Sequence, residues 1–155
     1  MQTRTRDSVM DYLQADHRRL DGLMEECKSQ METGDTTGAA GTFASFREGL
    51  DRHIRIEEEM VFPEFEAASG LGPAGGPTGV MRYEHAEIRR LLEAVHDLLT
   101  GAAPSAAEFE QLTGSLVALL HEHNQKEERI LYPMTDQMLP LQRLGSLCAK
   151  MREFE

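Results

Sequence analysis

The chain has 155 residues, of which 28% are charged and 40% hydrophobic, a balance typical of a soluble globular domain. Its formal net charge of -11 argues against nucleic acid and against anionic lipid as partners, because both are bound through clustered Lys and Arg. No apolar run reaches about 18 residues and segment 1–7 is polar, so we expect neither a membrane span nor a signal peptide. The length predicts that residues 1–155 form a single domain. The two cysteines do not make a disulfide framework, so a cytoplasmic location is expected.

Three segments rich in glycine and proline, at residues 34–41, 70–79 and 101–104, separate four stretches of helical periodicity. In the first stretch, apolar residues and one histidine recur in steps of four and three, which places them on one face of a helix. These residues are Leu13, His17, Leu20, Met24, Cys27 and Met31.

The second stretch continues this periodicity through a histidine and a glutamate that stand four residues apart. Its face comprises Phe43, Phe46, Leu50, His53, Glu57 and Met60. Pro63 follows ten residues after His53. Because proline has no backbone N–H, it is expected to kink or end the helix just past the His–Glu pair.

The third stretch repeats the stepping of the first. Its face comprises Met81, His85, Ile88, Leu92, Val95 and Leu99. Ser105 and Glu108 then have the spacing of a capping box, so a fourth helix is expected to begin there. The face of that helix comprises Phe109, Leu112, Leu116, Leu119, His123, Glu127, Ile130 and Met134. Pro133, ten residues after His123, is expected to act as Pro63 does.

A shorter helix is predicted after Pro140, through Leu141, Leu144, Leu147 and Met151. Strand signals are absent, because no extended two-residue alternation occurs and β-branched residues are sparse. The predicted fold is therefore all-α: an up-down-up-down four-helix bundle with a short C-terminal helix.

Six residues that can bind metal lie on these otherwise apolar faces. They are His17, His53, Glu57, His85, His123 and Glu127. A buried carboxylate without a partner costs several kcal/mol or becomes protonated. A single buried histidine is most simply a hydrogen-bonded core residue, but six such residues on four faces, arranged as a repeat, indicate a metal site. A purely structural bundle would carry Leu or Ile at these positions.

The ligand types indicate which metal is bound. Structural zinc prefers four ligands, often thiolates, and the two cysteines are not placed to contribute. Imidazole and carboxylate ligands for two ions suit iron, with manganese as the alternative. We therefore predict a pair of ions about 3.5–4 Å apart.

The pattern resembles the hemerythrin-like His-His-Glu (HHE) cation-binding domain over residues 10–135. The resemblance rests on His17, His85 and the two His-x-x-x-Glu pairs, each pair continuing with Glu, an aromatic residue and Pro. It implies a helical bundle that holds an oxo- or hydroxo-bridged di-iron centre. The four histidines would be terminal ligands, and Glu57 and Glu127 would bridge the irons.

One departure from the oxygen-carrying hemerythrins bears on function. Those proteins have a second histidine four residues after the one on the third helix, where this chain has Arg89. An even set of four histidines leaves an open position at each iron. The resemblance thus implies a protein that binds or reduces oxygen, nitric oxide or peroxide, in oxygen sensing or in oxidative or nitrosative stress. Whether the chain is an enzyme stays open.

The alternative function is an iron store or donor that resembles the proteins that repair iron centres and supplies iron to damaged Fe–S clusters. Such proteins usually carry an additional N-terminal cysteine-bearing domain. Only 16 residues precede His17, so that domain is expected to be absent, which favours the small-ligand interpretation. A donor or sensor needs a surface that responds to metal, and the helix after Pro140 is the candidate. The protein partner is not predicted.

A ferritin-like oxidase is disfavoured, because only Glu93 and His96 have the Glu-x-x-His spacing that this class needs twice. Glu127 is preferred over Glu128 as a ligand, since its repeat counterpart Glu57 also stands four residues after a histidine.

Five further residues are expected to lie outside the metal site. His96 lies beside its helical stripe, His121 is expected at the surface and Cys27 in the core. Tyr83 and Tyr132 could reach a bound oxygen species, although packing is the simpler role for both.

Overall fold

The computed structural model describes residues 7–155, and every regular element in that range is a helix. The predicted all-α class is therefore confirmed for this part of the chain; the first six residues of the polar N-terminal segment lie outside it. None of the described helices is long and apolar enough to cross a membrane. The elements are α1 (Val9–Glu32), α2 (Thr36–Ile56), η1 (Glu57–Val61), α3 (Phe62–Ser69), α4 (Pro77–Leu99), α5 (Ala106–Lys126), η2 (Glu127–Leu131), α6 (Tyr132–Met138) and α7 (Leu141–Glu153).

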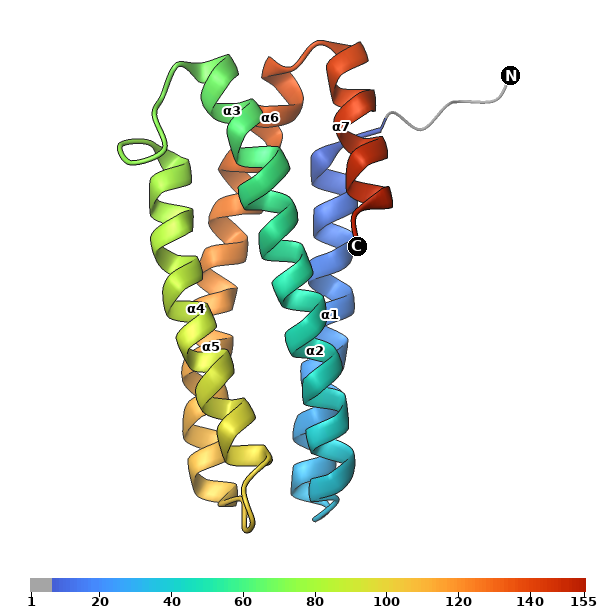
Figure 1. Cartoon of the computed structure of the whole chain (residues 1–155), viewed down its shortest axis with the longest axis vertical. Coiled ribbons are helices and arrows are strands. Elements are labelled where there is room, and N and C mark those ends of the chain that lie inside the picture. Colours follow the sequence, from blue (N-terminus) through green and yellow to red (C-terminus); the bar gives the residue numbers. More distant parts are fainter. Residues whose placement is uncertain (1–6) are drawn as a thin grey trace, which may run out of the picture.

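Four long helical columns lie side by side (Figure 1). Two of them are α1 and α4. The other two are composite: α2 continues through η1 into α3, and α5 continues through η2 into α6. The predicted C-terminal helix is confirmed as α7, which lies beside α1 at the end of the molecule that carries α3 and α6 (Figure 1).

Helix starts follow local and long-range capping. Ser105 accepts a hydrogen bond from the backbone N–H of Glu108 at 3.2 Å, so α5 begins where the capping box predicts. At the start of α1, the carboxylate of Asp136 on α6 accepts from the backbone N–H groups of Val9 and Met10, at 2.8 and 3.1 Å. A side chain from the far end of the sequence thus satisfies N–H groups that a helix start leaves unpaired.

The elements η1 and η2 are single π-helical turns, and they shift the buried face by one residue. The N–H of Phe62 donates to the carbonyl of Glu57, and that of Tyr132 donates to Glu127, each five residues back. The sequence predicts Met60 and Ile130 on the buried face. That prediction is wrong: Met60 is half-buried and Ile130 is 51% exposed, while the next residue along the chain is buried in each case. A wider turn uses one extra residue, so the 3.6-residue period fails across it.

Pro63 and Pro133 lie at the second positions of α3 and α6, directly after the π turns. The α-helical hydrogen bonding ends at Ile56 and at Lys126, before each proline, and resumes one turn later. The prolines therefore do not end the helical columns. Both prolines lie in the first turn of a new helix, where the backbone N–H that proline lacks would have no partner within the helix.

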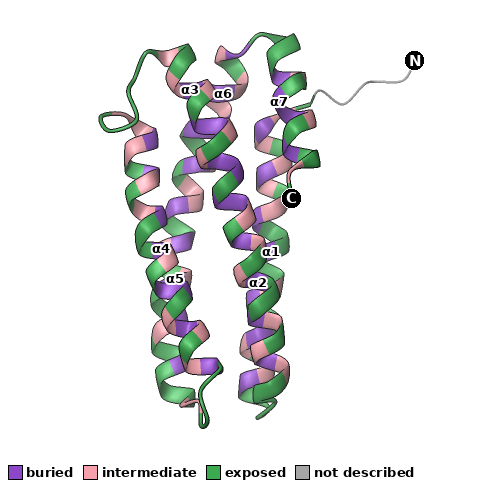
Figure 2. Ribbon diagram, viewed as in Figure 1, coloured by how far each residue is buried: buried purple, intermediate pink, exposed green. Residues whose placement is uncertain are grey.

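The interior consists of two apolar clusters with a polar layer between them, and the buried faces of the columns point inward (Figure 2). The first cluster includes Leu20, Phe43, Phe46, Ile88, Val95 and Leu116. The second includes Leu13, Phe65, Met81, Leu131, Leu147 and Met151. On α1, His17 lies between Leu13 of the second cluster and Leu20 of the first, and His85 lies likewise between Met81 and Ile88 on α4. The two clusters thus enclose the layer that contains the histidines.

Candidate metal centre

All six predicted ligand residues are buried in this layer. Their exposed fractions are 3% for His17, 2% for His53 and His123, and 0% for Glu57, His85 and Glu127. Each of the four columns contributes at least one of them. Residues as far apart in the sequence as His17 and Glu127 thus meet in one small volume.

The six residues form two groups that share one glutamate. In the first group, one ligand atom from each of Glu57, His85, His123 and Glu127 lies within 4.8 Å of the others. In the second group the same holds for His17, His53 and Glu127. We call these groups the His85 half and the His17 half. Each half has two histidines, as the sequence repeat predicts.

Each glutamate lies between a histidine of one half and a histidine of the other. Glu127 Oε1 is 3.3 Å from the Nε2 atoms of both His17 and His123. Glu57 Oε1 is 3.3 Å from Nε2 of His85 and 3.6 Å from Nε2 of His53. Two carboxylates in this arrangement could connect a pair of ions.

Four further carboxylates orient the histidine rings through Nδ1, at 2.8–2.9 Å. The pairs are His17 with Glu128, His53 with Asp16, His85 with Glu58, and His123 with Glu84. A carboxylate accepts the Nδ1 hydrogen, so Nε2 of every ring is turned toward the centre of the layer. Histidines that bind metal are commonly oriented in this way.

The sequence alone does not assign these four carboxylates to individual histidines, although the repeat contains a signal for them. Asp16 and Glu84 each precede the histidine of α1 or α4 by one residue, and Glu58 and Glu128 each follow the buried glutamate by one. The partner of each is a histidine on another column, which sequence spacing does not indicate. Glu128 orients His17 and is 25% exposed at its side chain, whereas Glu127 is fully buried among the histidines.

The buried polar atoms test whether these residues fit a metal. Within residues 7–155, His85 Nε2, Glu57 Oε1 and both carboxylate oxygens of Glu127 are buried without a hydrogen-bond partner. Such atoms are rare in native proteins because each one costs free energy. A cation would satisfy all of them at once, and imidazole nitrogens with carboxylate oxygens suit iron or manganese. The residues therefore fit a metal pair.

The charge state of the layer supports the same reading. Burial and the neighbouring Glu127 carboxylate raise the pKa of Glu57. Burial would also raise the pKa of Glu127, but the charge of the neighbouring His123 holds it well below its usual range. Burial lowers the pKa of His17 and His85, yet their glutamate partners raise both values to about 9. Glu57, His17 and His85 therefore favour their protonated forms when no ion is bound, and a cation at the centre of the layer would take the place of these protons.

The two halves differ in one aromatic residue. Tyr132 is fully buried; its hydroxyl donates to Glu57 Oε2 at 2.7 Å, and its oxygen lies 3.3 and 3.4 Å from Nε2 of His17 and His53. The repeat counterpart of Tyr132 is Phe62, which stacks on His85 with ring centroids 5.7 Å apart. Packing alone therefore does not describe Tyr132, while Tyr83 is 79% exposed and lies outside the site.

The remaining histidines and the two cysteines lie outside the cluster of six predicted ligand residues. His121 is exposed, as predicted, and His96 is half-buried near the end of α4. Cys27 is in the first apolar cluster, as predicted, and Cys148 is in the second. Burial raises the pKa of each thiol to about 11, so neither is poised to ionise.

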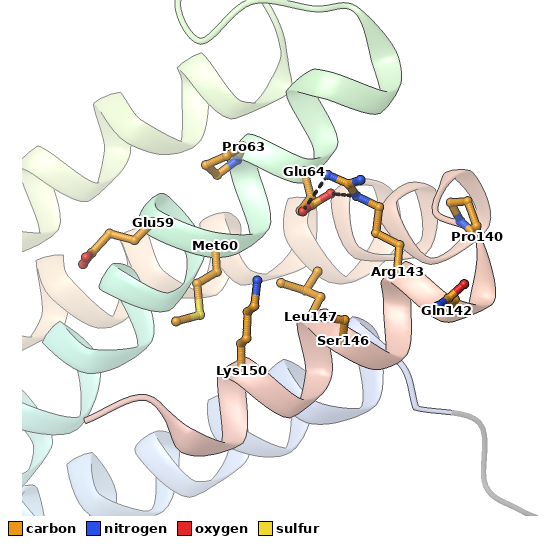
Figure 3. A pocket seen from close by; sticks show the side chains of 10 residues that line it. All are labelled: Glu59, Met60, Pro63, Glu64, Pro140, Gln142, Arg143, Ser146, Leu147 and Lys150. Atoms are coloured by element: carbon orange, nitrogen blue, oxygen red, sulfur yellow. Dashed lines mark hydrogen bonds and ion pairs between the residues drawn. The ribbon is translucent and has the colours of Figure 1, made fainter.

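A surface cleft of about 790 Å³ lies away from the cluster, between α7 and the η1–α3 segment (Figure 3). Arg143 of α7 and Glu64 of α3 form an ion pair beside it, with Nε to Oε2 at 2.6 Å (Figure 3). None of the six clustered residues lines this cleft. The polar layer is therefore the candidate site.

Comparison with known proteins agrees with the geometry. The model of the hemerythrin HHE cation binding domain matches residues 8–135. The chain belongs to this family. The resemblance of its His and Glu pattern is thus confirmed over most of the chain.

Two curated relatives of the chain are iron-sulfur cluster repair proteins. The protein YtfE of Edwardsiella ictaluri (strain 93-146) is 32% identical over 120 residues, which are 72% of this chain and 54% of that protein. The protein DnrN of Neisseria gonorrhoeae is 31% identical over 99 residues, 60% of this chain and 62% of that protein. The chain thus spans about half the length of the curated relatives it matches. No solved structure matches it.

Proposed function

We propose that this HHE domain holds a pair of iron ions and supplies iron to damaged iron-sulfur clusters in other proteins. The observation that carries the proposal is the buried His and Glu layer in a chain whose relatives are iron-sulfur cluster repair proteins. This similarity supports the repair interpretation better than the small-ligand interpretation that the sequence favoured. Manganese is the alternative metal.

The proposed ligands are His17, His53, Glu57, His85, His123 and Glu127. Glu57 and Glu127 would bridge the ions, because each lies between histidines of both halves. Bound iron supplies one-electron redox chemistry and positions open to exchange. The protein holds the imidazoles in one orientation through Asp16, Glu58, Glu84 and Glu128, and the two apolar clusters exclude water from above and below.

The finer features of the architecture belong to the same proposal. We infer an up-down-up-down order for the four columns, a single domain over residues 1–155 and a cytoplasmic location, which suits a chain with two free cysteines. The short connections between successive columns support the topology. Recipient proteins are the proposed partners.

The test is iron transfer. The chain is loaded anaerobically with ferrous ion and mixed with an iron-sulfur protein whose cluster has been destroyed by nitric oxide or peroxide. We expect about two irons per chain and recovery of the recipient's cluster absorption. The variant Glu127→Ala should bind less iron and restore less cluster. Glu59→Ala is the control. It removes an exposed acid of η1, the other π-helical turn, and should behave as wild type.

Two results would contradict the proposal. In one, the recipient recovers its cluster equally well from free ferrous ion and from the loaded chain, when both supply the same total iron and a chelator limits the free ion. The chain would then not be a donor. If the loaded chain instead changes its spectrum with oxygen, nitric oxide or peroxide and transfers no iron, the small-ligand interpretation holds.

A further inference from the structure

We propose that Tyr132 makes the two metal positions unequal, so that the His85 half binds its ion more tightly and the His17 half releases its ion first. This inference rests on the proposed iron-donor function and names the position from which iron would be delivered. Tyr132 acts as a positioning residue, through its hydrogen bond to a ligand carboxylate.

The first observation is the difference in hydrogen bonding between the halves. The Tyr132 hydroxyl donates to Oε2 of Glu57, the glutamate between the halves, but the two histidines that its oxygen adjoins, His17 and His53, both belong to the His17 half, with their Nε2 atoms at 3.3 and 3.4 Å. In the His85 half, the Nε2 atom of His85 and the facing oxygen of Glu57 have no hydrogen-bond partner among the described residues. A cation can therefore reach the His85 half directly, whereas in the His17 half it must compete with a buried hydroxyl.

The second observation is the break in the repeat. Position 62 corresponds to position 132, because both lie nine residues after a ligand histidine, and it carries phenylalanine. Phe62 stacks almost parallel on His85, at 9° between the rings, and has no polar atom to offer. Each half thus has two histidines, but the aromatic neighbours differ: Tyr132 has a hydroxyl that can occupy a ligand's hydrogen-bonding site, and Phe62 has none.

The surrounding cations oppose this difference only weakly. Arg89 and Lys126 bind the carboxylates that orient His85 and His123, which places positive charge near the His85 half. Their side chains are 40% and 45% exposed, so solvent and salt screen their repulsion of a metal ion. The Tyr132 contact is fully buried and is not screened.

The strength of the contact sets the expected size of the effect. A hydrogen bond to a charged group contributes enough to change a binding constant roughly ten- to a hundredfold. We therefore expect wild type to bind two ferrous ions in separate steps that differ by about this factor. Iron release to a chelator should be biphasic, with half of the iron in the fast phase.

The experiment is an anaerobic titration with ferrous ion against a competing ferrous chelator, with stoichiometry and release rates as readouts. Tyr132→Phe should tighten the weaker step about tenfold or more and slow the fast phase. Phe62→Tyr, which places a hydroxyl at the corresponding position of the other half, should weaken the tighter step. Tyr83→Phe removes an exposed hydroxyl and should change neither step. Circular dichroism checks that each variant is folded.

Three outcomes would overturn the inference. Wild type could bind both ions with one affinity. Tyr132→Phe could weaken binding, in which case the tyrosine oxygen is itself a ligand. Both halves could release iron at the same rate in wild type. Each of these results is compatible with two irons per chain and with transfer to a damaged cluster, so it would leave the proposed function standing. Failure to bind any iron would overturn both.

Discussion

At the scale of single residues, the site depends on carboxylates that are not themselves predicted ligands. Each of the four histidine rings donates from Nδ1 to an acid on a different column. These acids stay partly exposed, with side-chain exposures between 13% and 25%, while the histidines are almost fully buried. The layer can therefore present four Nε2 atoms inward without burying four additional charges completely.

Glu84→Gln tests the contribution of such an acid. The amide cannot carry the negative charge that orients and polarises His123, so we expect ferrous affinity to fall about tenfold. The measurement is a competition titration with a ferrous chelator. The matched control is Glu87→Gln, an exposed acid on the same helix that pairs with Arg90. Equal affinities for the two variants would show that the Glu84 contact has no role in binding.

At the scale of elements, the π turns and the cap on α1 connect distant parts of the chain. The π turns each begin at a buried glutamate and end one residue before an aromatic side chain that reaches a histidine. The extra residue rotates the helix that follows, which brings Val61 and Leu131 into the second apolar cluster. The same rotation places Asp136 of α6 at the start of α1.

Asp136→Ala should reduce stability by about 1 kcal/mol, because two backbone N–H groups at the start of α1 lose their acceptor. A change of this size corresponds to a drop of roughly 2–4 °C in the unfolding midpoint. Thermal unfolding followed by circular dichroism measures it. Asp97→Ala, at an exposed aspartate near the end of α4, is the control. The same loss in both variants would mean that general charge, and not the cap, is responsible.

At the scale of the whole molecule, a polar layer between two apolar clusters is a source of instability unless a cation is bound. The unpaired buried atoms of this layer, three carboxylate oxygens and Nε2 of His85, oppose folding. A ligand that binds only the folded state stabilises it, by an amount that grows with the logarithm of the ligand concentration divided by the dissociation constant. Metal binding and folding should therefore be strongly coupled in this chain.

Ferrous ion at about a thousand times its dissociation constant should stabilise the fold by about 4 kcal/mol. For a chain of this length that is an increase of roughly 10 °C in the unfolding midpoint. Differential scanning calorimetry under anaerobic conditions measures the shift, and excess chelator should reverse it. Glu127→Ala removes the glutamate shared by both halves and should respond much less. An unchanged midpoint in wild type would contradict the coupling.

The sequence by itself determined the helical segments, most of the buried face of each and the six residues in the polar layer; it placed Leu112 and Leu119 on the buried face of α5, where they are half-buried, and Leu141, which is 61% exposed, in the apolar pattern of α7. These features depend on the periodicity of single helices and on a repeat, and both can be read along one chain. It failed at Met60 and Ile130, because a π turn has the same local composition as the helix around it.

Only the tertiary structure decided which acid orients which histidine and how Tyr132 differs from Phe62. Those relations hold between columns. The physical reason is that periodicity specifies the direction of a side chain around its own axis, whereas the atom it meets depends on the register and rotation of the neighbouring helix.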